Sequence, residues 1–169
     1  RHGHLPGEKP IHRVNYAALS EPVYVRMGST DLWVLDELFM TDEYRDVVTA
    51  DLGPVRQIVD LGANAGISIR FWLQRWPDAR IIGVEPDANN FMVANMNAQA
   101  HRGGANVRLV RACVAGSERR VSLDRSRHES MYTMVEADEG GETDSVPAYP
   151  MTRILTDQQA AEEIDLLKC

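Results

Sequence analysis

The segment QIVDLGANAGISIRFWLQRWPDARIIGVEPD, residues 57–87, decides the fold class of this chain. It begins with a short apolar run, QIVDL (57–61), which ends in an acid and is followed by a glycine-rich turn. A second apolar run, ARIIGVEP (79–86), ends in another acid. Between the two runs, apolar residues recur at the spacing of one helix face, at Ile69, Trp72, Leu73 and Trp76. The segment therefore predicts a strand, a helix that Pro77 ends, and a second strand.

The part of the chain before this segment predicts one strand and one helix. PVYVRM (22–27) is rich in β-branched and aromatic residues, which is typical of a strand. Residues 29–44 follow a helical period, and Asp31 or Ser29 is expected to cap the helix. Its expected inward residues are Leu32, Leu35 and Phe39.

The part after the segment continues the alternation. Residues 87–100 predict a helix that Asp87 opens, with inward residues Phe91, Ala94 and Ala98. A polar loop, 136–144, is expected to be mobile. The other expected elements are a strand within 103–116, extended pieces at 119–124 and 145–150, a helix within 151–163 and a strand at 164–169.

Strands that alternate with helices indicate an α/β fold with a largely parallel sheet and helices on both faces. Residues 1–21 are expected to be a polar N-terminal extension, and residues 22–169 a single domain. Parallel sheets of this type bind ligands beyond the carboxyl ends of their strands. This rule places Asp60 and Glu85, which end the two strands of the deciding segment, at one edge of the sheet.

Composition excludes several classes of protein. The net charge of −7 argues against binding to nucleic-acid phosphates. No apolar run approaches the roughly 18 residues of a membrane span. The two cysteines, Cys113 and Cys169, form no C-x-x-C pair, so they are expected to be reduced thiols of a cytoplasmic protein. His, Asp and Glu residues show no compact spacing of a metal site.

The glycine turn predicts a close approach to a ligand. Gly62 and Gly66 are spaced G-x-x-x-G, which matches neither the dinucleotide fingerprint G-x-G-x-x-G nor a P-loop. Glycine has no Cβ, and the helix that follows offers free N–H groups, which can hold a carboxylate. The alternative interpretation is that both glycines permit tight packing of helix against strand.

The two acids suggest which ligand the turn holds. A carboxylate at Glu85 can accept hydrogen bonds from both hydroxyls of a ribose, and Asp60 can lie near a cationic group. A ligand with an amino-acid end and a ribose end fits this pair, and S-adenosylmethionine has both. The alternative interpretation of Glu85 is a solvated strand end.

These residues resemble a known family. VDLGANAGISI (59–69), IIGVEPDANNF (81–91) and IDLLK (164–168) are similar to the FkbM-type S-adenosylmethionine-dependent methyltransferases. VRMGSTDLWVLDELFMTDEY (25–44) is similar to the segment that precedes the motifs in that family. The resemblance implies a Rossmann-like methyltransferase fold and methyl transfer to a hydroxyl of a sugar, polyketide or other secondary metabolite.

The resemblance also implies a set of site residues. The methionine end of the cofactor would be lined by Asp60, Gly62, Ala63, Asn64 and Gly66. Glu85 would hold the ribose with Pro86 and Asp87 nearby, and Ala112 and Cys113 would border the adenine. Asp31 and Tyr44 would close over the cofactor, although core packing accounts for Tyr44 nearly as well.

The chain departs from the family pattern after IDLLK, where the family continues with an acid, Glu-Gly and further strands. The expectation is a sheet truncated after its fourth core strand. The chain would then be a fragment, a truncated form, or a short variant that pairs with another copy.

Methyl transfer to a hydroxyl benefits from a base. Asp165 and Lys168 are three positions apart on the last strand and therefore point to opposite faces, and Lys168 is expected to face the site. His128 is the second candidate for the base. The alternatives to a methyltransferase are a non-catalytic half-domain that binds a nucleoside or supports a partner, and an NAD-dependent oxidoreductase.

Overall fold

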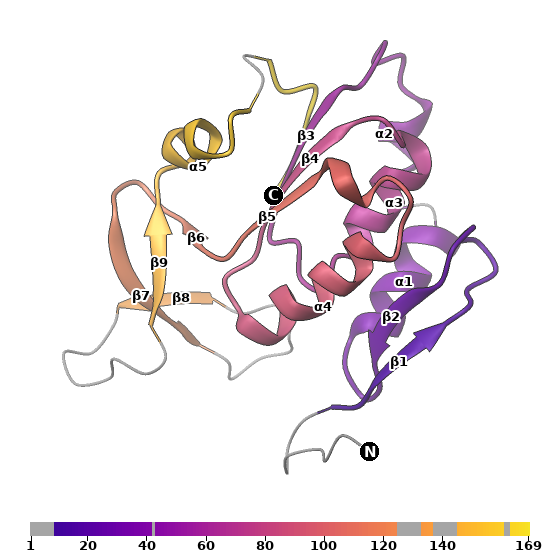
Figure 1. Ribbon diagram of the computed structural model, residues 1–169, viewed down its shortest axis with the longest axis horizontal. Coiled ribbons are helices and arrows are strands. Elements are labelled where there is room, and N and C mark those ends of the chain that lie inside the picture. The colour runs from indigo at the N-terminus through magenta and orange to yellow at the C-terminus, as the bar shows by residue number, and fades with distance from the viewer. Residues whose placement is uncertain (1–8, 42, 125–132, 137–144, 161–162) are drawn as a thin grey trace.

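The computed structural model describes residues 9–41, 43–124, 133–136, 145–160 and 163–169 (Figure 1). In chain order, its elements are β1 (Ile11–Val14), β2 (Val23–Arg26), α1 (Asp31–Met40), α2 (Arg45–Thr49), β3 (Gln57–Leu61), α3 (Ile67–Arg75), β4 (Arg80–Val84), α4 (Ala88–Gln99), the 3-10 turn η1 (Gly104–Asn106), β5 (Val107–Val110), β6 (Cys113–Val114), β7 (Arg119–Asp124), β8 (Thr133–Glu136), β9 (Val146–Tyr149), α5 (Met151–Asp157) and β10 (Leu166–Lys168).

Four parallel strands form the central sheet, in the order β10–β3–β4–β5. β3 lies inside the sheet, where both of its faces are covered, and this explains why its apolar run is continuous. β4 and β5 lie on one side of β3 and β10 lies on the other. The strand order therefore reverses at β3, and ligands of open α/β sheets bind beside such a reversal, beyond the carboxyl ends of the strands.

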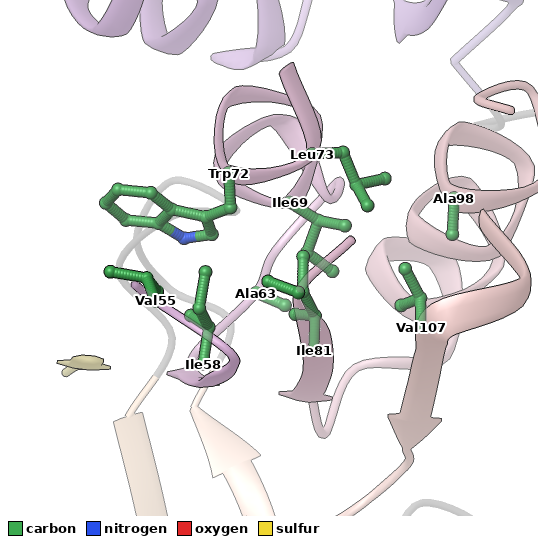
Figure 2. Packing of buried hydrophobic residues seen from close by; sticks show 10 residues of the cluster. Val55, Ile58, Ala63, Ile69, Trp72, Leu73, Ile81, Ala98 and Val107 are labelled. Carbon is green, nitrogen blue, oxygen red and sulfur yellow. The ribbon is translucent and has the colours of Figure 1, made fainter. Parts of the chain in front are cut away.

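Helices cover both faces of this sheet, so the predicted α/β class is confirmed. On one face, α3 and α4 bury a cluster against β3 and β4, in which Ile69 and Trp72 lie over Ile58 and Ile81 (Figure 2). On the other face, Ile154 of α5 packs with Ile82 and Val84 of β4. Burial of one such side chain stabilises the fold by about 1.5–3 kcal/mol.

The predicted faces of the helices are correct in α3 and only partly correct in α1 and α4. Ile69, Trp72 and Leu73 are buried, as expected, whereas Trp76 follows the end of α3 and is half-buried. In α1, Leu35 is buried as expected and Phe39 is half-buried, but Leu32 is exposed. The inward residues of α1 include Leu38 instead of Leu32, because the stripe that meets β2 and α3 contains Leu35 and Leu38.

A buried asparagine displaces part of the expected face of α4. Ala94 and Ala98 are buried as expected, but Phe91 is half-buried while Asn97 is fully buried. The Asn97 side chain accepts a hydrogen bond from the Tyr24 N–H at 2.7 Å and donates one to the Tyr24 carbonyl at 2.8 Å. It also donates to the carbonyl of Ala65 at 2.8 Å. Asn97 therefore joins α4 to β2 and to the glycine turn, which an apolar periodicity cannot indicate.

The described residues form two further sheets. β1 and β2 form an antiparallel pair, so residues 11–14 of the expected N-terminal extension belong to a sheet. β6, β9, β7 and β8 form a second four-stranded sheet, in which β7 and β9 are the two predicted extended pieces and β8 was not predicted. Of the expected mobile loop, residues 137–144 lie outside the described residues.

Gly66, the residue before α3, lies close to the backbone of α4. It has a positive φ of 74°, and a Cβ there would lie 2.9 Å from the backbone Cα of Ala94. Gly66→Ala is therefore expected to reduce the free energy of unfolding by roughly 3 kcal/mol, measured by urea denaturation. Gly53 is a matched control, because it has a φ of 64° but no atom lies within 4 Å of the position that its Cβ would occupy. Gly53→Ala should lose only about 1 kcal/mol, and equal losses would contradict the packing role of Gly66.

Candidate functional site

The turn from Gly62 to Gly66 adopts a conformation that most residues avoid. Gly62, Asn64 and Gly66 have positive φ angles of 73°, 49° and 74°. Asparagine is one of the few residues other than glycine that tolerates this region. The N–H groups of Gly62 and Ala63 donate to the carbonyl of Val84 at 2.9 and 3.0 Å. The turn is thus fastened to the carboxyl end of β4, next to Glu85.

The two glycines have different functions in this turn. No atom lies within 4 Å of the position that a Cβ of Gly62 would occupy, whereas a Cβ of Gly66 would meet α4. Tight packing therefore explains Gly66 and does not explain Gly62. Gly62 has open space around its missing Cβ, and it also lines a pocket.

This pocket has a volume of about 340 Å³ and lies between α1 and the glycine turn. Its lining residues come from α1, the segment after α1, the turn, the start of α3 and the end of β10. They are Asp31, Trp33, Val34, Glu37, Leu38, Glu43, Tyr44, Gly62, Ala63, Asn64, Ala65, Ile67, Ser68 and Lys168. Since β3 and β10 both end here, the pocket lies at the reversal of strand order.

Glu85 is buried and holds three hydrogen-bond donors. One carboxylate oxygen accepts from the Asn64 N–H at 2.8 Å. The other accepts from the Asp87 N–H at 2.9 Å and from the Asn90 side chain at 3.2 Å. Burial raises the pKa of Glu85, and these hydrogen bonds oppose that shift. The predicted proximity of the two strand ends is confirmed, because Glu85 contacts the turn directly.

Asp60 is fully buried below the turn. One carboxylate oxygen accepts from the Ser68 hydroxyl at 2.6 Å and from the Trp72 indole N–H at 3.2 Å. The other oxygen forms an ion pair with Lys168 Nζ at 2.9 Å. Asp60 therefore stabilises the turn from beneath, and it is absent from the pocket lining.

Lys168 lines the pocket, as predicted, but its ammonium group already has partners. Besides the ion pair with Asp60, Nζ donates to the carbonyl of Gly62 at 2.7 Å and to that of Leu61 at 3.3 Å. Asp165 lies at the opposite end of the strand, where its carboxylate accepts from the N–H groups of Arg56 and Gln57. Of this pair, Lys168 lines the pocket and Asp165 does not, and the catalytic role of Lys168 stays a prediction.

A buried arginine that the sequence motifs do not include supports the other side of the site. Arg26 binds both carboxylate oxygens of Asp31, with Nε at 2.9 Å and Nη2 at 2.7 Å. It also donates to the Asn90 side chain at 2.6 Å and, at 3.4 Å, to that of Asn64. The sequence contains one indication of this pairing. Arg26 is a charged residue within the apolar strand PVYVRM, and a buried charge requires a partner.

Asp31 begins α1 and is itself fully buried, with its carboxylate paired to Arg26. The expected cap of α1 is partly correct: the Ser29 hydroxyl accepts from the Asp31 N–H at 3.0 Å, but Thr30 is the N-cap residue. Tyr44 lines the pocket and stacks on Trp72 with ring centroids 4.7 Å apart. Burial raises the pKa of Tyr44, and the negative charge of Asp60 raises it further.

The remaining predicted site residues lie outside the pocket or outside the described residues. Asp87 caps α4, where its carboxylate accepts from two backbone N–H groups, and Pro86 lies between it and Glu85. Ala112 packs against β4 and α5, and Cys113 packs within the sheet of β6 to β9, where burial raises the pKa of its thiol. His128 lies outside the described residues.

The described parts of the chain contain neither a membrane-spanning helix nor a cluster of metal-ligating side chains. None of the helices there has the length and apolar character that crossing a bilayer requires. In the same residues, no three His, Cys, Asp or Glu side chains come together as a metal site would require.

No protein-family model and no curated protein matches the chain. Among solved structures, part of the chain is similar to geranyl diphosphate C-methyltransferase from Streptomyces coelicolor A3(2) in complex with Mg²⁺, geranyl diphosphate and S-adenosyl-L-homocysteine (22% identity, TM-score 0.36, 63% of this chain and 40% of that chain). It is also similar to geranyl diphosphate methyltransferase in complex with SAM (21% identity, TM-score 0.37, 64% of this chain and 44% of that chain). The chain thus spans less than half the length of these proteins, and its function is inferred from its own site.

Glu85 is expected to make stability depend on pH. Glu85→Ala removes the acceptor of three donors and should reduce the free energy of unfolding by about 2 kcal/mol at pH 7. Because the folded pKa is raised above the ordinary value of 4.5, the titration of Glu85 favours folding below pH 4.5. This contribution is lost as the pH rises through the folded pKa. Urea denaturation at several pH values should show the loss caused by the variant shrinking with rising pH, and a loss that grows would contradict the raised pKa.

Proposed function

We propose that this chain binds S-adenosylmethionine across the glycine turn and transfers its methyl group to a hydroxyl of a small molecule. The observation that carries the proposal is the position of the pocket. It lies at the reversal of strand order and is lined by the turn at Gly62, with Glu85 at the end of the adjacent strand.

The residues around the turn fit the methionine end of this cofactor. The absence of a Cβ at Gly62 leaves room for a close approach of the ligand to the backbone. Ile67 and Ser68 begin α3 and line the pocket, and the first N–H groups of a helix have no partner within the helix. A carboxylate is favoured at such a helix terminus, which suits the carboxylate of the methionine end.

Glu85 fits the ribose end. A carboxylate has about four acceptor positions, and three donors of the chain bind the Glu85 oxygens. The remaining acceptor capacity suits a ribose hydroxyl. The same three contacts fix the orientation of the carboxylate before the ligand binds, which reduces the entropy lost on binding.

The cofactor supplies a methyl group on a positively charged sulfur. In the transfer, a lone pair of the acceptor oxygen forms the new C–O bond, the electrons of the C–S bond remain on sulfur, and the hydroxyl proton leaves to a base. The chain contributes mainly alignment of the two reactants. In this proposal Lys168 orders the turn rather than removing the proton, because its ammonium group already donates to two carbonyls.

The FkbM-type family is part of the proposal, supported by GANAG, VEPD and IDLLK in the sequence. We also place the protein in the cytoplasm, which suits the free, buried thiol of Cys113.

Thermal unfolding with different ligands separates this proposal from its alternatives. S-adenosylhomocysteine at 100 times its dissociation constant should stabilise the protein by about 2.7 kcal/mol, whereas NAD should have no effect. Stabilisation by NAD alone would indicate an oxidoreductase. Stabilisation by neither ligand would favour a half-domain that supports a partner without catalysis.

A further inference from the structure

The outer wall of the pocket has an aromatic surface that core packing does not explain. Trp33 projects from α1, lines the pocket and is 61% exposed. Val34 and Leu38 from the same helix line the wall beside it, and Tyr44 lines it from the segment after α1. An exposed indole at the opening of a cavity provides a flat apolar surface on which a ligand can lie.

The same wall carries negative charge without a matching cation. Glu37 and Glu43 both line the pocket, and in the part of the chain that the structure describes no cationic side chain pairs with either. Desolvation by burial raises the pKa of Glu37, and the nearby negative charge of Glu43 raises it further. The repulsion between them is a cost that a bound cation would remove.

Each of the other charged groups of the lining, Asp31 and Lys168, is paired with a residue outside the lining. Asp31 is paired with Arg26, whose Nη2 lies 2.7 Å from one carboxylate oxygen. Lys168 is paired with Asp60 at 2.9 Å. The uncompensated charge of the described lining is therefore that of Glu37 and Glu43, and Glu37 lies on α1 as Trp33 does.

We infer that the outer part of the pocket binds an amphipathic amine as the methyl acceptor, with its apolar body against Trp33 and its ammonium group beside Glu37 and Glu43. A cation near an indole face gains further from the cation–π interaction. The ammonium group is the recognition handle and not the nucleophile, since a protonated amine has no lone pair. The same charges disfavour acceptors that carry a phosphate or a carboxylate.

The inference rests on the proposed function for the methyl transfer, but the preference for charge can be measured separately. Three probes share a phenol ring and differ in the end group: tyramine is a cation, 4-hydroxyphenylethanol is neutral and 4-hydroxyphenylacetate is an anion. Their affinities are measured by NMR titration of the protein alone and again with S-adenosylhomocysteine. Tyramine should bind at least about 10-fold more tightly than the neutral probe, and the anion should bind most weakly.

Two variants test which residues cause the preference for the cationic probe. In Glu37→Gln/Glu43→Gln, tyramine and the neutral probe should bind about equally, while affinity for S-adenosylhomocysteine is unchanged. Trp33→Ala should weaken the binding of all three probes. Glu163→Gln, an exposed glutamate outside the lining, should leave the tyramine preference intact.

The other possible results distinguish a failure of the inference from a failure of the proposed function. Equal binding of the three probes to the wild-type protein means that the wall does not select a cation. A loss of S-adenosylhomocysteine affinity in the double glutamine variant means that the carboxylates hold the ammonium group of the cofactor instead. If tyramine is preferred but S-adenosylhomocysteine does not bind, the cation site stands and the proposed methyltransferase function fails.

Discussion

Gly62→Val is expected to reduce the affinity for S-adenosylhomocysteine by at least about 100-fold, which corresponds to about 2.7 kcal/mol. Gly62 has a φ of 73°, a region in which a β-branched residue is strained. The new side chain would also enter the open space at the pocket. Both effects act on the surface that the cofactor is proposed to cover. Isothermal titration calorimetry measures the change.

Gly53→Val is the matched control for this variant. Gly53 also has a positive φ, 64°, and open space around its missing Cβ, but it lies outside the pocket lining. The two variants should lose similar amounts of stability, about 1–2 kcal/mol, because the backbone strain is the same in kind. Only the Gly62 variant should lose the ligand. If both variants bind S-adenosylhomocysteine like the wild type, the turn is not the cofactor site.

Lys168→Met is expected to reduce the free energy of unfolding by roughly 3 kcal/mol at pH 7. The substitution keeps the length of the side chain and removes the cation that lies 2.9 Å from the carboxylate of Asp60. Asp60 is fully buried, so its charge would be left without compensation. The carbonyls of Leu61 and Gly62 would lose a donor as well, which should loosen the turn. Chemical denaturation measures the loss.

A second substitution tests this explanation. Asp60→Asn/Lys168→Met removes both charges and should recover much of the lost stability, since no uncompensated charge remains. A single variant as stable as the wild type would show that the ion pair contributes little.

The sequence predicts the central strands and the turn because their causes are local. The continuous apolar run QIVDL is typical of a strand that is covered on both faces, and it forms β3 at the predicted residues. The glycine-rich turn follows β3 as predicted, and Gly62 and Gly66 adopt positive φ angles there, which glycine tolerates. Asp87 caps α4 as predicted, because its side chain accepts from the N–H groups two and three residues later.

The parts of the site that the sequence does not predict depend on contacts between distant residues. Arg26 meets Asn90 across 64 positions, and Lys168 meets Gly62 across 106. Asn97 lies on the inward face of α4 because its partners are the backbone groups of Tyr24 and Ala65. Such pairs appear only when the elements are assembled, since a polar residue in the sequence does not reveal its partner.

The binding site of S-adenosylhomocysteine, mapped by two-dimensional NMR on the isotope-labelled protein, tests the central claim most directly. Binding across the turn predicts the largest shifts for the backbone amides of residues 62–68 and of Glu85 and Asp87. The amides of β7 and β9, in the second sheet, should remain unchanged. A folded protein whose spectrum does not respond, or whose shifts lie in the second sheet, would contradict the proposed cofactor site.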